Sequence, residues 1–208
     1  MTKQGNFIVF EGIDGSGKST QIQLLADRLR QKNISYYMTM EPTYSPIGSV
    51  VHQILAGRVK TDNRVLAALC AADRLDHLLN EIDGIAGKVS DGYTVLSDRY
   101  YFSSYAYQGV DMSMDWIIHT NEQSSAILKP TVNIFIDIDA DTAMERIMKN
   151  RFHQELFEKK SRLQKVRENY LEAFEKLKNS ENVLIVDGTK SMEEISEQIW
   201  TGVEKYFV

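Results

Sequence analysis

Short apolar runs alternate along the chain with longer segments in which apolar residues recur every three or four positions. The short runs are typical of buried strands, and the longer period is typical of helices that pack one face against a core. Strands that alternate with helices predict a parallel sheet with helical crossovers. The five expected strands are Phe7–Phe10, Ser35–Thr39, Thr94–Leu96, Val132–Ile136 and Val183–Val186.

This spacing predicts a helix over Thr20–Arg30, a second near residues 163–177 and a third at the end of the chain. In each helix the regularly spaced apolar residues share a face that we expect to be buried. These residues are Ile22, Leu25 and Leu29 in the first helix, Leu163, Val166, Tyr170, Phe174 and Leu177 in the second, and Met192, Ile195, Ile199 and Val203 in the last.

A further helix is predicted around residues 65–79, and it carries two different faces. Cys70, Arg74 and His77 share one face because four and three positions separate them. That face either lines a cleft or meets solvent. The expected core stripe of the same helix is Val65, Leu69, Ala72, Leu75 and Leu79.

The length and composition are those of an ordinary globular domain. The 208 residues, 43% hydrophobic and 25% charged, are enough to build a single core without disulfides or a structural metal. No repeat, low-complexity tract or linker divides the chain, so we expect one domain over residues 1–208. The single cysteine, Cys70, excludes an intrachain disulfide.

Several classes of protein are disfavoured by the sequence. The longest apolar run, Val65–Ala72, has eight residues, whereas a membrane-spanning helix needs about 20. No signal-peptide core precedes Glu11, so we expect a cytoplasmic protein with no membrane partner. The net charge of −5 argues against nucleic-acid binding. Although the chain as a whole is acidic, residues 146–178 form a basic segment with ten basic and five acidic side chains.

A phosphate-binding motif follows the first expected strand. Residues 12–19 read GIDGSGKS and fit the pattern G-x-x-x-x-G-K-[ST]. The glycines let backbone N–H groups turn inward, and the next helix adds the positive end of its dipole. Lys18 would then neutralise the β- and γ-phosphates of ATP, and Ser19 would offer its hydroxyl to Mg²⁺. The predicted ATP-binding residues are Gly12, Asp14, Gly15, Ser16, Gly17, Lys18, Ser19 and Thr20.

Asp98 and Arg99 follow the third expected strand, at the carboxyl edge of the sheet beside this loop. An aspartate there is often a turn former or a helix cap. With a phosphate loop beside it, Asp98 is predicted to hold Mg²⁺ or its water together with Ser19. Arg99 would bind the phosphate of an acceptor, and a surface ion pair is its alternative role.

The phosphate loop binds a donor nucleotide but does not identify what receives the phosphate. A switch GTPase would need an Asn-Lys-x-Asp type motif that reads guanine, and the 208 residues contain none. A small-molecule kinase needs a second cationic site and a closing segment that excludes water. Arg99, Arg74 and the basic segment are candidates for these parts.

Three blocks of the sequence resemble the thymidylate kinase family, in the order and at the spacing of that family. They are FEGIDGSGKST at residues 10–20, AADR at 71–74, and DRY with AYQG at 98–100 and 106–109. The resemblance implies an α/β P-loop NTPase fold with a five-stranded parallel sheet flanked by helices. It also implies a short helical lid within about residues 146–162, a homodimer, and the Mg²⁺-dependent reaction ATP + dTMP giving ADP + dTDP.

The resemblance also implies roles for individual residues. Asp14 matches an acidic residue that faces the sugar and the metal, Arg99 matches the clamp on the acceptor phosphate, and Arg74 matches the arginine at the thymine edge. Ser104 falls where the family places a small polar residue against the base. Tyr107 falls where a ring excludes a ribose 2′-hydroxyl, with a core tyrosine as the alternative. The predicted acceptor-binding residues are Asp14, Glu41, Tyr44, Cys70, Arg74, Arg99, Ser104 and Tyr107.

Two positions depart from the family's pattern in the acceptor site. Cys70 stands where the family usually has a phenylalanine that stacks on the base, and this loss would weaken acceptor binding about tenfold. Tyr44 and Phe102 are the rings that could replace it. Met40 precedes Glu41, where an arginine is common.

The positions between Ile13 and Ser16 contain no arginine, unlike those family members that place one in this loop. The missing charge is therefore expected on the lid, with Arg151 as the predicted residue and Arg162 as a second candidate. The predicted catalytic residues are Lys18, Asp98, Arg99 and Arg151. A kinase with another acceptor and a nucleotide-binding regulator without turnover remain the alternatives.

Overall fold

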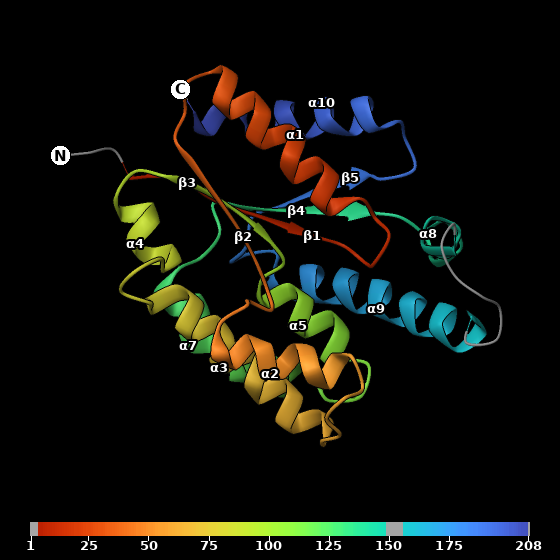
Figure 1. Ribbon diagram of the computed structural model, residues 1–208. Coiled ribbons are helices and arrows are strands. Elements are labelled where there is room, and N and C mark those ends of the chain that lie inside the picture. The colour runs from red at the N-terminus through yellow and green to blue at the C-terminus, as the bar shows by residue number, and fades with distance from the viewer. Residues whose placement is uncertain (1–3, 149–155, 208) are drawn as a thin grey trace.

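The computed structural model describes residues 4–148 and 156–207, which contain a five-stranded sheet of parallel strands (Figure 1). The strand order is β2-β3-β1-β4-β5, with β1 in the centre. The parallel α/β fold predicted from the alternating pattern is confirmed. The strands are β1 (Phe7–Glu11), β2 (Tyr36–Met40), β3 (Thr94–Asp98), β4 (Val132–Asp137) and β5 (Val183–Asp187).

Helices connect the strands, and local signals mark where several of them begin. Ser45 and Asp62 accept backbone N–H groups of the helices that follow them, and Ser191 and Glu194 form a capping box. The helices are α1 (Lys18–Gln31), α2 (Pro46–Leu55), α3 (Asn63–Leu79), α4 (Ile85–Ser90), α5 (Tyr101–Gln108), α6 (Met114–Thr120), α7 (Glu122–Ile127), α8 (Ala140–Met148), α9 (Leu156–Leu177) and α10 (Met192–Val203).

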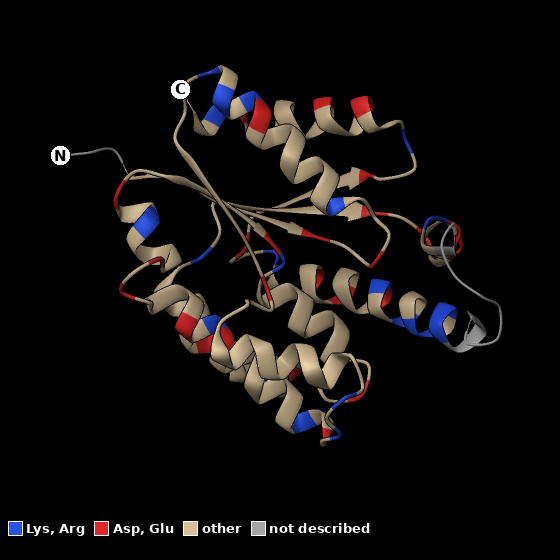
Figure 2. Cartoon of the chain, viewed as in Figure 1, with Lys and Arg blue, Asp and Glu red and all other residues tan. Residues whose placement is uncertain are grey.

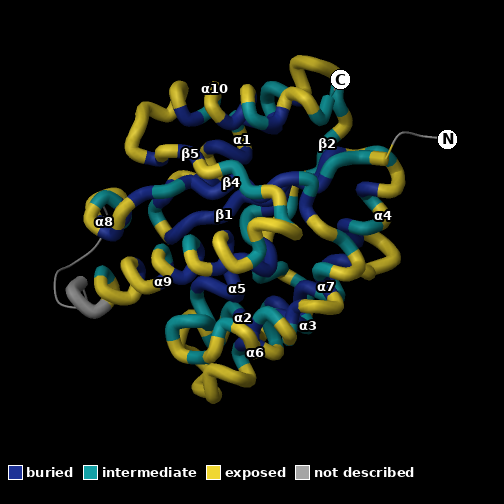
Figure 3. The backbone as a smooth tube through the Cα atoms, turned by 180° about the vertical axis from the view of Figure 1, so that it is seen from behind, coloured by how far each residue is buried: buried dark blue, intermediate teal, exposed yellow. Residues whose placement is uncertain are grey.

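The sheet lies between two layers of helices (Figure 1). Helices α1 and α10 cover one face, while α5 and α9 pack against the other, with α2 and α3 beyond them. Because side chains alternate along a strand, Ile8 and Phe10 of β1 enter the core under α1 and α10, and Phe7 and Val9 enter the other core. The central strands β1, β3 and β4 are therefore buried on both faces, whereas the edge strands β2 and β5 are partly exposed (Figure 3).

The carboxyl ends of the central strands form the edge where the functional residues gather. Phe10 of β1 lies opposite Asp98 of β3, so the chain leaves these two strands at neighbouring points. Figure 2 shows acidic residues at these strand ends and a run of basic residues along α9. The edge is the place where ligands bind in open parallel sheets.

The predicted core stripe of α3 is wrong at both of its ends. Val65 is 46% exposed and Leu79 is 60% exposed, whereas Ala67, Arg74 and Leu78 are buried. The helix turns its polar face inward because the Arg74 guanidinium finds acceptors on every side there, as described below. Cys70 and Arg74 therefore line a cleft, while His77 of the same face is buried against Glu41 and Thr39. An apolar stripe is left on the outer surface.

The other predicted helix faces agree with the structure except in the first turn of α10. Ile195, Ile199 and Val203 of α10 are buried, while Met192 in its first turn is 47% exposed. Among the described residues, no helix is both long and apolar enough to span a bilayer.

Candidate active site

The phosphate loop runs from the end of β1 to the start of α1, and two of its glycines have no substitute. Gly12 and Gly15 have φ angles of 148° and 84°, a region that other residues rarely adopt. A Cβ on Gly12 would lie 2.7 Å from Ser16 Oγ, and one on Gly15 would lie 2.8 Å from the carbonyl oxygen of Ala143. The tight loop predicted from the motif is therefore the conformation that the chain adopts.

The side chain of Lys18 is buried beneath this loop. Its Nζ donates hydrogen bonds to the carbonyl oxygens of Gly12 at 3.1 Å and Ile13 at 3.3 Å. Burial, together with the positive charge of Arg99, lowers the pKa of Lys18 to about 8. A polyanion bound in the loop would favour the protonated amine.

A cavity of about 330 Å³ opens in front of the loop. Most of the predicted ATP-binding residues line this cavity. Gly12 and Ser16 do not line it and belong to the supporting part of the loop. The cavity is lined by Asp14, Gly15, Gly17, Lys18, Ser19, Thr20, Asp98 and Arg99.

Ser19 and Asp98 form a pair of oxygen donors at one wall of this cavity. The Ser19 hydroxyl donates to Asp98 Oδ2 at 2.9 Å, and Asp98 Oδ1 is buried with no hydrogen-bond partner among the described residues. A buried carboxylate oxygen without a partner fits a hard cation. Magnesium at kinase sites is held by one or two such groups together with the substrate phosphates, so these residues fit Mg²⁺.

Arg99 lies at the start of the loop after β3 in a strained conformation. Its φ of 77° is in the left-handed region, which costs about 1–2 kcal/mol for a residue with a Cβ. The guanidinium donates to Asp14 Oδ1 at 2.6 Å, to Ser103 Oγ at 3.1 Å and to Tyr107 Oη at 3.3 Å. These contacts offset the strain and hold the positive charge at the sheet edge.

A buried carboxylate that the sequence analysis did not assign supports Arg99 from behind. Glu11 at the end of β1 accepts hydrogen bonds from Ser103 Oγ at 2.6 Å, Tyr170 Oη at 2.8 Å and the Tyr100 amide at 2.9 Å. Burial raises the pKa of Glu11, and these hydrogen bonds oppose that rise. Ser103 thus links Glu11 to Arg99, while Tyr170 ties both to α9.

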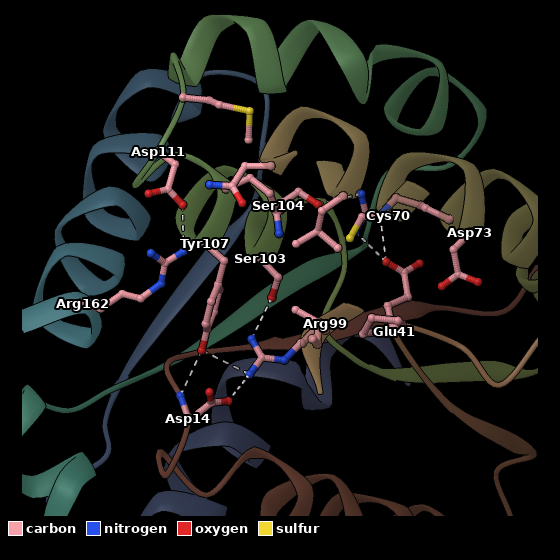
Figure 4. A pocket seen from close by; sticks show the side chains of 17 residues that line it. Asp14, Glu41, Cys70, Asp73, Arg99, Ser103, Ser104, Tyr107, Asp111 and Arg162 are labelled. Atoms are coloured by element: carbon pink, nitrogen blue, oxygen red, sulfur yellow. Dashed lines mark hydrogen bonds and ion pairs between the residues drawn. The ribbon is translucent and has the colours of Figure 1, made fainter. Parts of the chain in front are cut away.

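A second cavity of about 390 Å³ lies beside the first, between α3, α5 and α9 (Figure 4). Asp14 and Arg99 line both cavities, so the two spaces meet beside Asp14 of the phosphate loop. The remaining lining residues are Glu41, Pro42, Leu55, Asn63, Leu66, Cys70, Asp73, Arg74, Ser103, Ser104, Tyr107, Gln108, Asp111, Met112 and Arg162.

Arg74 in the wall of this second cavity is saturated by protein acceptors. Its Nε donates to Glu41 at 2.8 Å, and its Nη2 lies 2.8 Å from the same carboxylate oxygen in an ion pair. Its Nη1 donates to Ser104 at 3.1 Å and to the Asn121 side chain. Nη2 also donates to the carbonyl oxygen of Tyr100 at 3.2 Å. Each of the three guanidinium nitrogens thus donates to the protein. The Ser104 hydroxyl accepts from Arg74 and lines the cavity, so its own hydrogen is available to a ligand.

Tyr107 and Cys70 also lie where the sequence analysis expects them, at the second cavity. Tyr107 Oη accepts the Asp14 amide at 3.1 Å, and the Arg99 guanidinium stands 4.8 Å from the centre of its ring. Burial raises the pKa of the Cys70 thiol to about 11, so the thiol is neutral. Cys70 thus presents a small apolar group where a ring would stack on a base.

Neither ring proposed to replace the missing phenylalanine lies at the second cavity. Tyr44 is 78% exposed and stacks on His52 with a centroid distance of 5.0 Å, because its loop turns the side chain outward. Phe102 is fully buried against Phe174 and Tyr105. Met40 is 39% exposed on an edge strand and lines neither cavity.

The two predicted lid residues have different outcomes. Arg151 lies outside the described residues. Arg162 of α9 donates to Asp111 at 2.9 Å and lines the second cavity but not the cavity in front of the phosphate loop. The long side chain of Arg162 is thus at the acceptor end of the site.

Further site residues appear only in the folded chain. The Gln108 Oε1 atom is buried in the wall of the second cavity with no hydrogen-bond partner among the described residues. Gln108 belongs to the AYQG block, so the resemblance to the family was the sequence feature that could have identified it. Arg146 of α8 donates to the carbonyl oxygens of Gly188 at 2.8 Å and Ser16 at 3.4 Å, and joins the phosphate loop to the loop after β5.

Comparison with known proteins assigns the chain to a family. The model for the thymidylate kinase family matches residues 10–199. The chain belongs to the thymidylate kinase family. Members of this family are phosphotransferases, and the resemblance stated from the motifs is confirmed.

Two relatives illustrate the extent of the match. A protein named "Probable thymidylate kinase" from Methanocaldococcus jannaschii is 40% identical over 197 residues, which cover 93% of each chain. The "Thymidylate kinase" of Ligilactobacillus salivarius is 34% identical over 200 residues, covering 92% of this chain and 94% of that protein. This thymidylate kinase family member is thus similar to its relatives over nearly its full length.

The lowered pKa of Lys18 predicts a pH dependence of ATP binding. With a pKa of about 8, Lys18 is charged below pH 8 and loses its proton as the pH rises above it. The dissociation constant for ATP, measured by calorimetry, is expected to increase by up to about tenfold per pH unit above pH 8. Lys18→Arg should flatten this dependence because arginine stays charged. Equal slopes for the two proteins between pH 7 and 9.5 would contradict the assignment.

Proposed function

We propose that this protein transfers the γ-phosphoryl group of ATP to dTMP, giving ADP and dTDP. The observation that carries the proposal is the meeting of the two cavities at Asp14 and Arg99. Two nucleotides that enter from opposite sides would bring their phosphates together at this junction. Such an arrangement converts a reaction between two solutes into one between held groups.

The donor would occupy the cavity in front of the phosphate loop. The Lys18 ammonium would neutralise the β- and γ-phosphates, and the backbone of residues 12–17 would surround them. Ser19 and Asp98 would hold Mg²⁺, which when bound supplies further positive charge to the phosphates. The Arg146 guanidinium, between the phosphate loop and the loop after β5, would form one side of the space for the donor nucleoside.

The acceptor phosphate would be bound by Arg99. An oxygen of that phosphate forms the new bond to the γ-phosphorus, while the bond from the γ-phosphorus to the bridging oxygen breaks and ADP leaves. The attacking oxygen is already anionic near pH 7, because the second pKa of a phosphate monoester is about 6. No general base is needed, in agreement with the absence of histidine from both cavity walls in the described chain.

The base of the acceptor would be read by Gln108 and Ser104. Thymine presents an N–H group between two carbonyl oxygens, and Gln108 Oε1 is a buried acceptor that lacks a donor. The Ser104 hydroxyl, fixed by Arg74, would donate to a carbonyl oxygen. This pairing favours thymine and uracil over cytosine, whose ring nitrogen at the same position is an acceptor. Tyr107, held between Asp14 and Arg99, would limit the space beside the sugar.

A kinase with a different acceptor is the second candidate, and the small side chain of Cys70 favours it. No aromatic ring among the described residues faces Cys70 across the acceptor cavity except Tyr107, which packs against Arg99. The acceptor cavity could therefore admit a larger or differently substituted base. A regulator that binds nucleotide without turnover is the remaining alternative.

The proposed reaction is tested by measuring ADP release with a panel of acceptors. We expect ATP-dependent turnover with dTMP that exceeds turnover with dUMP, UMP, CMP, AMP, GMP and thymidine. Lys18→Ala should keep the fold and lower kcat by about a hundredfold or more, since it removes a charge that faces the transferred group. A different preferred acceptor would support the second candidate, and ATP binding with no acceptor-dependent ADP release would support the regulator.

Restoring a ring at Cys70 is expected to strengthen acceptor binding. Stacking on a base contributes about 1–3 kcal/mol, so Cys70→Phe should lower the KM for dTMP about fivefold or more and leave the KM for ATP unchanged. Cys70→Ala is the matched control because it removes the thiol without adding a ring. An increase in the KM for dTMP in the phenylalanine variant would show that no base lies beside this position.

We also propose that residues 1–208 act as one kinase domain in the cytoplasm, and that two copies form a homodimer through the outer stripe of α3. This stripe consists of Val65, Leu69, Ala72, Leu75 and Leu79. Its spacing is that of a buried helix face, yet its ends are largely exposed in the single chain. Ile82, just beyond the helix, is 88% exposed. An apolar surface of this kind is typical of a protein interface, and a second copy supplies a matching stripe by symmetry.

Charged residues on this stripe are expected to separate the dimer. The double substitution Val65→Glu and Leu79→Glu should convert a dimeric mass in light-scattering chromatography to a monomeric one. Both side chains are exposed in the single chain, so the fold should tolerate the change. Ile185→Glu, an exposed residue of β5, is the control that should leave the mass unaltered. A monomeric wild-type protein at micromolar concentration would contradict the dimer.

A further inference from the structure

The loop between β2 and α2 forms one wall of the acceptor cavity. We call residues 41–45 the acceptor loop, since Glu41 and Pro42 line that cavity and no residue of the loop lines the donor cavity. The loop has no regular secondary structure of its own. Its shape must therefore come from contacts with the elements around it.

Asp73 of α3 makes three of these contacts with one buried carboxylate. Its Oδ2 accepts the backbone N–H of Thr43 at 2.8 Å, and its Oδ1 accepts the hydroxyls of Thr43 at 2.6 Å and Ser45 at 3.1 Å. Asp73 is only 1% exposed. A carboxylate buried to this degree is stable only when its oxygens are paired, so the loop and Asp73 depend on each other.

The neighbouring residue of the same helix holds the other end of the acceptor loop. Arg74 binds Glu41 at 2.8 Å, directly before Pro42, whereas Asp73 binds the residues directly after it. Two consecutive residues of α3 therefore clamp the loop on both sides of Pro42. This arrangement places the clamp on the buried face of the helix, opposite the outer apolar stripe.

Helix α2 closes the loop from its remaining side. A Cβ on Gly48 would lie 2.1 Å from the carbonyl oxygen of Thr43, so only glycine allows the helix to approach this closely. His52 of the same helix lies 3.2 Å from the carbonyl oxygen of Pro42 and stacks beneath Tyr44. The acceptor loop is thus held by α2 and α3 through contacts within the chain.

We propose that Asp73 is a positioning residue for the acceptor, acting through the hydroxyl and amide of Thr43 to keep the wall formed by Glu41 and Pro42 in place. Asp73 need not touch the nucleotide, because its oxygens are used by the loop. A preformed wall lowers the ordering cost that the acceptor would otherwise meet on binding. The inference rests on the proposed function, in that the cavity concerned is the acceptor site.

Calorimetric titration of dTMP and, separately, of ATP with Mg²⁺ into the full chain tests this role. Asp73→Asn leaves one oxygen but places an N–H group against a backbone N–H, so the dissociation constant for dTMP should increase about tenfold. The dissociation constant for ATP should stay within about twofold, since the acceptor loop lies outside the donor cavity. In turnover, the KM for dTMP should rise while kcat changes little.

Three variants make the test independent of a general loss of stability. Thr43→Val removes one hydroxyl bound by Asp73 and should weaken dTMP binding severalfold, and Thr43→Ser should restore it. Asp76→Asn, one turn along α3, is the matched control, because its carboxylate accepts no hydrogen bond from the described residues and should leave dTMP binding unchanged. If Asp73→Asn does not fold, the two Thr43 variants carry the test.

The results separate this inference from the proposed function. Failure of the wild-type protein to bind dTMP would reject the proposed acceptor. Wild-type binding with unchanged affinity in folded Asp73→Asn and Thr43→Val would overturn the positioning role. A parallel loss of ATP and dTMP affinity would also overturn it, because it would show a general structural effect.

Discussion

The contact between Arg99 and Asp14 is the interaction on which the rest of the site depends. The Arg99 guanidinium, just after β3, lies 2.6 Å from Asp14 Oδ1 of the phosphate loop, at the point where the two cavities meet. Burial disfavours the charged form of Arg99, but Tyr107, Tyr170 and Asp14 outweigh that effect and hold the pKa of Arg99 above its ordinary value. A permanent positive charge is thereby fixed where two polyanions would approach.

This charge requires support from distant parts of the chain. Glu11 lies behind Arg99, shares Ser103 with it and reaches Tyr170 of α9. The parallel sheet makes this possible, because the ends of β1 and β3 lie side by side. This cluster of Glu11, Ser103, Tyr170 and Arg99 connects helix α9 to the site. The packing of α9 and the placement of Arg99 are therefore coupled.

The same physical requirement explains the orientation of α3. Arg74 and Asp73 are buried and fully paired, and leaving either without partners would cost several kcal/mol. Turning these residues inward exposes an apolar stripe, which a second copy of the chain would cover. Helix α3 thus lines the acceptor cavity with one face and would form the proposed dimer with the other. The close contact of Gly48 with Thr43 packs α2 against the acceptor loop.

The repeating apolar pattern and the GIDGSGKS motif determined the sheet, its helices and the donor end of the site. Those features depend on local spacing, on positive φ angles that glycine adopts without strain, and on residues adjacent in the chain, such as Asp98 and Arg99. The acceptor end depended on contacts between residues 30 or more positions apart, such as Arg74 with Glu41 and Asn121. Apolar periodicity favoured the wrong face of α3, because periodicity does not count the hydrogen-bond partners of a buried guanidinium. The outward position of Tyr44, the pairing of Arg162 with Asp111 and the unpartnered oxygen of Gln108 were likewise decided by the tertiary structure, since only packing brings such distant groups together.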